Sequence, residues 1–133
     1  METSKKDNLP TILVGGNPFE EFVEDNTVFV DKTRIISTLI NDPQRAFFLS
    51  RPRRFGKTLL LDTIKNIFEG EKHLFENLDI GKSEFDRAWE PFPVIMFSFN
   101  GYPHDPVLLK KRLIYELNKI VAQHKLPIRT VND

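Results

Sequence analysis

The triplet Gly56, Lys57 and Thr58 contains the residue types best suited to chemistry in this sequence. Glycine lets the backbone lie against a phosphate group, a lysine ammonium can reach the β- and γ-phosphates of a nucleotide, and a threonine hydroxyl can ligate Mg²⁺. An apolar run at 46–49 precedes the triplet, and an amphipathic run at 59–68 follows it. Strand, loop and helix in this order cradle nucleotide phosphates, because the free N–H groups and the dipole of the helix start face the anion.

The loop departs from the general phosphate-binding pattern, which requires a glycine where this chain has Arg51. An ordinary basic turn between a strand and a helix is therefore the competing interpretation. Under the phosphate interpretation, Lys57 is the candidate catalytic residue and Thr58 the candidate Mg²⁺ ligand. The loop residues that we expect to contact the nucleotide are Arg53, Arg54, Phe55, Gly56, Lys57, Thr58 and Leu59.

Segments on both sides of the loop resemble the AAA-ATPase-like family. Members of this family carry a VDKT segment followed by an FLSRPRRFGKS loop, so Arg51 fits the family's version of the loop and Thr58 keeps the hydroxyl of the usual serine. The resemblance extends over residues 9–121, and its RPRRFGK core is the specific part. The matching segments are FVDKT at 29–33, FFLSRPRRFGKT at 47–58, FEG at 68–70, LF at 74–75 and WEPFPV at 89–94.

The resemblance implies an ATP- and Mg²⁺-binding α/β domain, in which helices flank a parallel sheet of the P-loop NTPase type. Full-length members continue to a second apolar strand ending in acidic residues, which hold Mg²⁺ and polarise water, and commonly to a nuclease-like domain. No apolar run after Phe99 ends in Asp-Glu. We therefore expect the N-terminal part of an ATPase with an incomplete sheet. Its domain organisation would be a flexible arm at 1–10 and a partial P-loop domain at 11–133.

Two consequences follow from an incomplete sheet. ATP turnover by this chain alone should be poor or absent, because the acidic strand that would support hydrolysis is not recognisable. Unpaired strand edges and an uncovered apolar face also favour self-association or association with the remainder of the ATPase.

The hydrophobic pattern predicts alternating helices and strands. Apolar residues recur at helical spacing in 17–23, 31–40, 57–68 and 105–124, with capping residues or prolines at several of the starts. Residues 73–87 are expected to form a helical or irregular connection. Short apolar runs predict strands at 27–30, 46–49 and 94–99. The run at 46–49 does not alternate, which is typical of a strand covered on both faces of a parallel sheet.

Such a sheet would bring two loops together, because ligands lie beyond the carboxyl ends of parallel strands. Residues 50–58 and the residues after Phe99 should then face one crevice. Asn100 would be a candidate contact near the γ-phosphate, although a plain turn at Asn100 and Gly101 is the favoured interpretation.

The segment Asp31–Thr33 has two interpretations of similar weight. By resemblance, Asp31 belongs to the nucleotide site and could approach the base or ribose. By local physics, Asp31 caps the helix that follows it and Lys32 lies in solvent.

The loop also concentrates positive charge in a chain that is neutral overall, with 19 basic and 19 acidic residues. Guanidinium groups at 51, 53 and 54 could balance a triphosphate, since they match phosphate oxygens in two-point contacts. Alternatively, the cluster could bind a nucleic-acid backbone or a protein partner. Nucleic acid is less favoured, because such binding spreads basic residues over a wider face.

Composition sets the remaining limits. A chain of 133 residues with 40% hydrophobic content can build one core. It contains no cysteine, which excludes disulfides and thiolate chemistry, and its three histidines lack metal-ligand spacing. No secretory signal is evident and no apolar run approaches the length of a membrane span. We expect a cytoplasmic protein without membrane partners.

Overall fold

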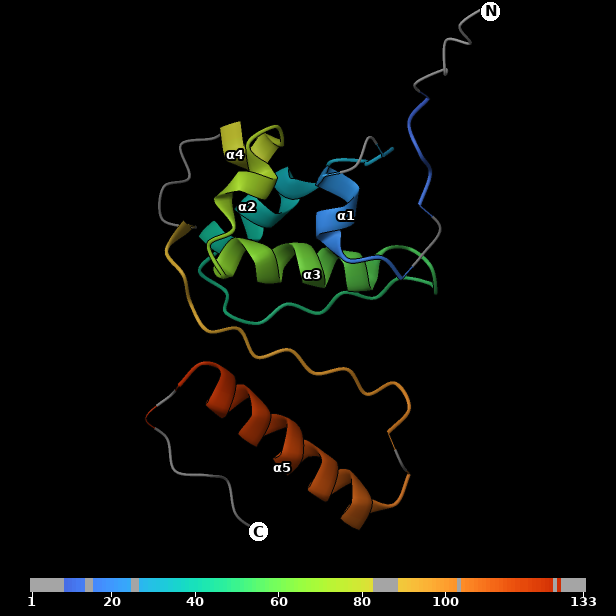
Figure 1. Cartoon of the computed structure of the whole chain (residues 1–133), viewed down its shortest axis with the longest axis vertical. Helices are drawn as coiled ribbons and strands as arrows, with labels where there is room; N and C mark the ends of the chain where they lie inside the picture. Colours follow the sequence, from blue (N-terminus) through green and yellow to red (C-terminus); the bar gives the residue numbers. More distant parts are fainter. Residues whose placement is uncertain are drawn as a thin grey trace, which may run out of the picture. The chain divides into compact units, whose positions relative to one another are not determined.

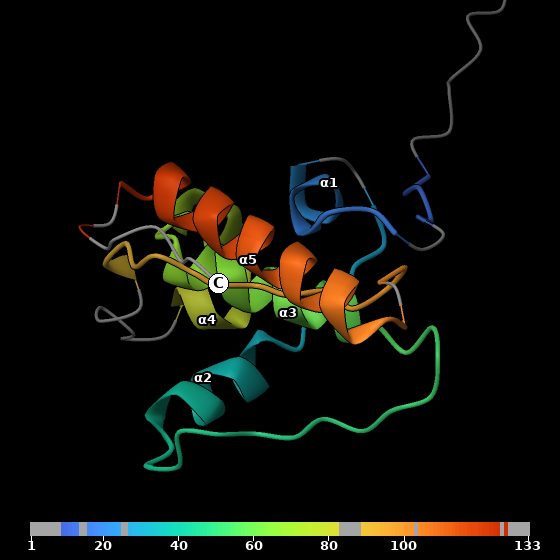
Figure 2. The same ribbon diagram turned by 90° about the horizontal axis from the view of Figure 1, so that it is seen from below.

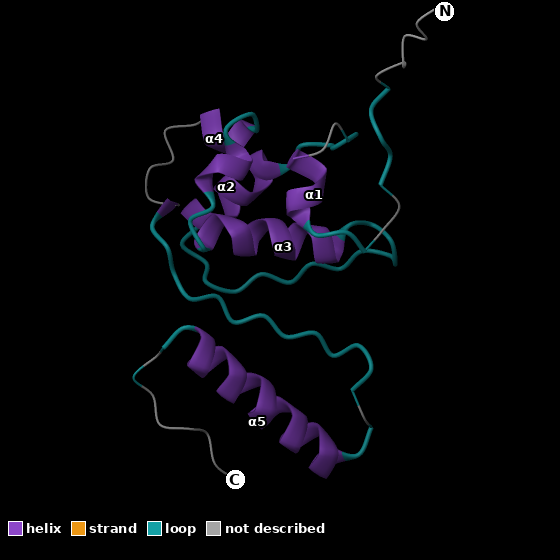
Figure 3. Cartoon of the chain, viewed as in Figure 1, coloured by secondary structure: helices purple, strands orange, loops and turns teal. Residues whose placement is uncertain are grey.

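The computed structural model describes residues 9–13, 16–24, 27–82, 89–102, 104–125 and 127, and its regular elements are helices (Figure 3). They are α1 (Phe19–Glu24), α2 (Thr33–Asn41), α3 (Lys57–Phe68), the 3-10 helix η1 (Lys72–Phe75), α4 (Asp79–Lys82) and α5 (Pro106–Gln123). The chain forms two compact units, one through Phe92 and one from Pro93 onward. Among the described residues, no helix is long and apolar enough to cross a membrane.

The first unit packs around two phenylalanine rings. Phe19 of α1 and Phe75 of η1 are fully buried and stack with ring centroids 4.8 Å apart. Phe29 meets the ring of Phe19 edge-on at 5.7 Å. Ile36 and Ile67 bring α2 and α3 to the same core. In the view of Figure 1, α1, α2 and α4 lie on one side of α3, so this core supports the helix that follows the loop.

Helix positions agree with the periodicity argument, but the N-cap of α2 is Lys32, without a side-chain cap, and not Asp31 as expected. Helix α3 begins at Lys57, directly after the loop, as predicted. Helix α5 begins with Pro106 at its first turn, and the Oδ1 atom of Asp105 accepts a hydrogen bond from the N–H of Leu108 at 2.8 Å. This bond satisfies one of the unpaired N–H groups at the helix start. The connection after α3 contains η1 and α4, as a helical or irregular segment should, and residues 83–88 lie outside the described part.

The described residues form no parallel sheet, so the α/β fold prediction is wrong. Among the described residues, the β-pairing consists of one isolated parallel bridge between Thr11 and Thr27. Residues 46–49 and 94–99, predicted as strands, have no regular secondary structure. Figure 2 shows the first of these segments within an extended loop that joins α2 to α3.

The physical reason is the lack of a backbone partner. An apolar run favours extended backbone, but a strand also needs a neighbour whose N–H and C=O groups are in register. No ladder of this kind reaches residues 46–49 in the described structure, and the side chain of Phe48 is 94% exposed. The apolar composition therefore predicted burial that the structure does not provide.

Candidate functional site

The loop of residues 51–58 has an unusual backbone at two positions. Gly56 is the N-cap of α3 and has φ +73°, in the left-handed region. Arg54 also has a positive φ, of 65°, which costs a residue with a Cβ about 1–2 kcal/mol. A Cβ added at Gly56 would meet no atom within 4 Å, so glycine is needed there for backbone conformation and not for space.

The side chain of Lys57 turns back across the loop. Its Nζ atom donates hydrogen bonds to the backbone oxygen of Arg51 and, at 2.9 Å, to that of Pro52. The side chain is partly buried and does not extend into bulk solvent. The ammonium group is therefore held against the backbone at the beginning of the loop.

The start of α3 offers open hydrogen-bond donors. The N–H of Leu60 donates to the oxygen of Gly56 at 2.9 Å, which is the first turn of the helix ladder. Within the described residues, the N–H groups of Lys57, Thr58 and Leu59 donate to no backbone oxygen. These donors, together with the positive end of the helix dipole, face the same loop as the ammonium of Lys57.

The remaining predicted contacts divide into two groups. Phe55, Gly56 and Leu59 line a cavity beside the loop. Arg53, Arg54 and Thr58 are exposed and do not line it. The loop thus has exposed polar side chains away from the cavity and other residues that adjoin it.

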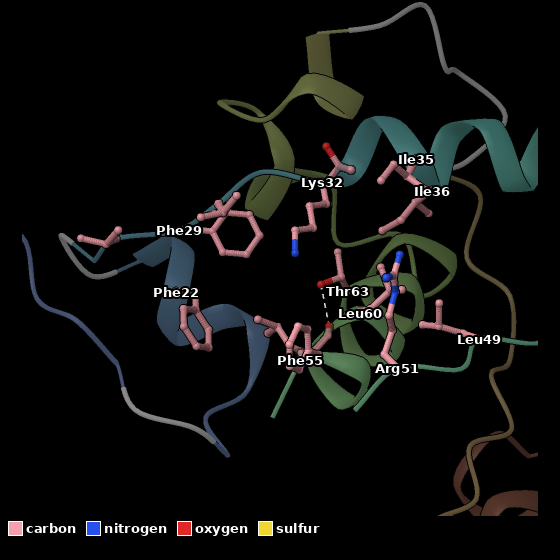
Figure 4. Close-up of a pocket in the computed structure, with 15 residues that line it drawn as sticks. Phe22, Phe29, Lys32, Ile35, Ile36, Leu49, Arg51, Phe55, Leu60 and Thr63 are labelled. Atoms are coloured by element: carbon pink, nitrogen blue, oxygen red, sulfur yellow. Dashed lines mark hydrogen bonds between the residues drawn. The ribbon is translucent and has the colours of Figure 1, made fainter. Parts of the chain in front are cut away.

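This cavity has a volume of about 590 Å³ and lies within the first unit. Figure 4 shows its walls, which come from three parts of the chain: Phe22 with residues 28–36, residues 49–56 and residues 59–63. Most lining side chains are apolar or aromatic, and Lys32 and Arg51 supply its two cationic side chains. Sequence reasoning missed the cavity because no local pattern brings these segments together. The apolar lining residues are Phe22, Val28, Phe29, Val30, Ile35, Ile36, Leu49, Phe55, Leu59 and Leu60.

Both carboxylate oxygens of Asp31 accept hydrogen bonds from other groups of the protein. Its Oδ1 atom accepts hydrogen bonds from the N–H and hydroxyl of Thr33, at 2.8 and 2.7 Å. Its Oδ2 atom accepts the N–H of Asp79 at 2.7 Å, while the Thr33 hydroxyl oxygen accepts the N–H of Ile80 at 3.1 Å. We call this set the Asp31–Thr33 clamp. It joins the start of α2 to the start of α4, which favours the structural interpretation of Asp31 over a nucleotide contact.

The clamp also sets the ionisation of Asp31. Burial by itself would raise the pKa of this carboxyl group. The hydrogen bonds from Asp79 and Thr33, with the charge of Lys82, outweigh burial and lower the pKa below its ordinary value of 3.8. The carboxylate is therefore the form that the folded state stabilises.

Asn100 lies in the second unit and forms part of a turn. Gly101 has φ +74°, and the N–H of Tyr102 donates to the oxygen of Phe99 at 3.3 Å. Asn100 lines a small cavity of about 280 Å³ with Tyr102 and Arg112. The prediction of a crevice shared with the loop rested on a parallel sheet, and it loses its basis with that sheet.

Comparisons with known proteins support the relationship that the motifs suggest. The sequence model of the family described as "Predicted AAA-ATPase" matches residues 13–131. The chain is also similar to the "Uncharacterized protein in vnfD 5'region" of Azotobacter chroococcum mcd 1, with 42% identity over 78 residues. That match includes 58% of this chain and 14% of the length of the relative. No solved structure matches the chain.

Proposed function

Because the chain belongs to the predicted AAA-ATPase family, we propose that its loop at 51–58 binds the phosphates of ATP together with Mg²⁺. The observation that carries this proposal is the position of Lys57, whose ammonium group bonds to the backbone oxygens of Arg51 and Pro52 inside the loop. An anion entering the loop would find this charge next to the open N–H groups of α3. The family as a whole supports the choice of a nucleotide over other anions.

The residues present fit a bound phosphate. Gly56 holds the left-handed backbone at the start of α3, and no protein atom lies within 4 Å of the position its Cβ would take, so this backbone is open to an anion. Thr58 is exposed at the first turn of α3 and would contribute its hydroxyl to Mg²⁺. When bound, the metal neutralises charge on the phosphate oxygens. Mg²⁺ commonly keeps water molecules and phosphate oxygens as its other ligands.

The proposal concerns binding. Turnover also needs groups that position and activate the attacking water. The described residues contain no cluster of three or more His, Asp or Glu side chains that could hold a metal ion. We expect slow or undetectable phosphate release by this chain alone.

Calorimetric titration with ATP and Mg²⁺ tests the proposal directly. Lys57→Ala removes the charge inside the loop and should weaken ATP binding about 10- to 100-fold, the range for losing hydrogen bonds to a charged group. Lys111→Ala is the matched control, since it removes an exposed lysine on α5 in the second unit. Equal affinities for the three proteins, or no binding by the wild type, would refute the proposal.

A second candidate function has one observation in its favour. The side chains of Arg53 and Arg54 are exposed and lie outside the cavity, so they are accessible to a large polyanion. A gel-shift assay with DNA or RNA at several salt concentrations would separate the two functions. Strongly salt-dependent binding that ATP does not compete with would favour nucleic acid.

A further inference from the structure

The cavity of about 590 Å³ opens onto the loop that the proposed function assigns to phosphates. Arg51, Phe55 and Gly56 belong to the loop and to the cavity wall at once. A ligand with its phosphates at the start of α3 would therefore have the rest of its structure beside this wall. This inference rests on the proposed function and concerns the nucleoside part of the ligand.

Lys32 lies on the wall formed by residues 28–36. Figure 4 shows its ammonium group projecting into the cavity toward α3, between Phe29 and Thr63. This ammonium has no hydrogen-bond or ion-pair partner among the described residues. A mobile cation held over an apolar cavity is free to donate hydrogen bonds to a ligand there.

The neighbours of Lys32 explain why it takes this direction. Asp31 and Thr33 are held against α4 by the clamp, through bonds to the N–H groups of Asp79 and Ile80. Lys32 stands between these two fixed residues. The clamp therefore positions the backbone of Lys32, and the lysine side chain extends over the cavity.

The chemistry of the walls indicates the ligand class. Phe22, Phe29 and Phe55 offer aromatic surface for a flat ring, and two cations on an apolar cavity favour a ring bearing hydrogen-bond acceptors. We propose that Lys32 contacts the nucleoside part of ATP, donating hydrogen bonds to ring or sugar acceptors while the cavity receives the base. In this arrangement Lys57 acts on the phosphates and Lys32 selects for a nucleoside attached to them.

The test compares ATP with inorganic tripolyphosphate, which has the phosphates but no nucleoside. Both are titrated with Mg²⁺ into the full 133-residue chain as wild type, Lys32→Met and Lys57→Ala. Methionine keeps an unbranched apolar stem over the cavity and removes the charge. We expect Lys32→Met to weaken ATP binding about tenfold and to leave tripolyphosphate affinity within about twofold, whereas Lys57→Ala weakens both.

Lys111→Met is the matched control and should change neither affinity. Phe55→Ala supplies a second probe of the cavity, because Phe55 is 64% exposed and its loss should not disturb the core. It should likewise weaken ATP more than tripolyphosphate. Circular dichroism confirms that each variant remains folded.

The outcomes separate the two claims. Equal losses for ATP and tripolyphosphate in Lys32→Met would overturn the nucleoside contact, as would unchanged ATP binding, even if Lys57→Ala still behaves as expected. Failure of the wild type to bind either ligand would overturn the phosphate site and the nucleoside contact together.

Discussion

The two sides of the loop at residues 51–58 differ in how the folded structure supports them. After the loop, α3 packs on a core in which Phe19 and Phe75 are completely buried. Before the loop, residues 46–49 carry apolar side chains that lie on the surface, with Phe48 94% exposed. The loop is thus anchored through its helix and not through the segment that leads into it. Similar apolar composition on the two sides has very different energetic consequences.

The largest difference in stability is expected between removing a core phenylalanine and removing a surface phenylalanine. Phe75→Ala removes a ring that packs against both Phe19 and Trp89, and should lower the free energy of unfolding by about 3–5 kcal/mol. Phe48→Ala makes the same chemical change on the other side of the loop and should alter it by less than about 0.5 kcal/mol. Urea denaturation of both variants measures the difference.

A comparable loss in both phenylalanine variants would mean that residues 46–49 pack in solution. The contrast between the two sides of the loop would then fail. Sedimentation of the same samples adds a second readout, because an exposed apolar segment favours self-association. Phe48→Ala should shift the chain toward the monomer if the segment mediates that contact.

An intermediate effect is expected at the clamp. Asp31→Asn leaves one N–H donor of Asp79 or Thr33 without its carboxylate acceptor, and should cost about 1–2 kcal/mol at pH 7. The pKa of Asp31 is lowered in the folded state, so its carboxylate stabilises the fold above the unfolded pKa near 3.8. That contribution is lost as the pH falls below this value through the folded pKa.

The difference in unfolding free energy between wild type and Asp31→Asn should therefore shrink below about pH 4. Denaturation curves at pH 7, 4 and 3 measure it. Asp42→Asn is a suitable control, because Asp42 accepts one local bond from Gln44 and joins no second helix. A difference that stays constant with pH would show that ionisation of Asp31 does not strengthen the clamp.

A smaller loss of stability than at the clamp is expected in the loop itself. Gly56→Ala forces a Cβ into a backbone with φ +73° and should cost about 1 kcal/mol through strain, since no neighbouring atom lies within 4 Å. Gly16→Ala is matched, with φ +81° and equally open space far from the loop in sequence. Thermal unfolding should place the two variants close together, and only Gly56→Ala should also weaken ATP binding.

The sequence predicted the features that depend on residues close together in the chain. The start of α3 after Gly56 and the Asp105 cap of α5 follow from residue types within a few positions, and both are confirmed. The sheet depends on pairing between distant segments, which composition alone cannot supply. The apolar run at 46–49 predicted a buried strand, and the structure shows neither the strand nor the burial.

In the candidate site, too, the contiguous motif was predicted and the contacts between distant segments were not. Gly56 and Lys57 form one contiguous pattern, and the structure places them at the head of α3 with the ammonium inside the loop. The cavity was missed because its walls come from three separate segments. Lys32 is exposed, as the capping interpretation of Asp31 expected, but its position on the cavity wall was not predicted. The residues that fix its direction include Asp79 and Ile80, more than forty positions away.

The Asp31–Thr33 clamp makes two helix starts depend on one carboxylate. Because amides of α2 and α4 share that acceptor, opening one helix exposes the donors of the other. Hydrogen exchange should therefore find these two short helices opening as a single cooperative unit, with α3 retaining its protection longer. The order in which the helices of the first unit unfold would then depend on the Asp31 side chain.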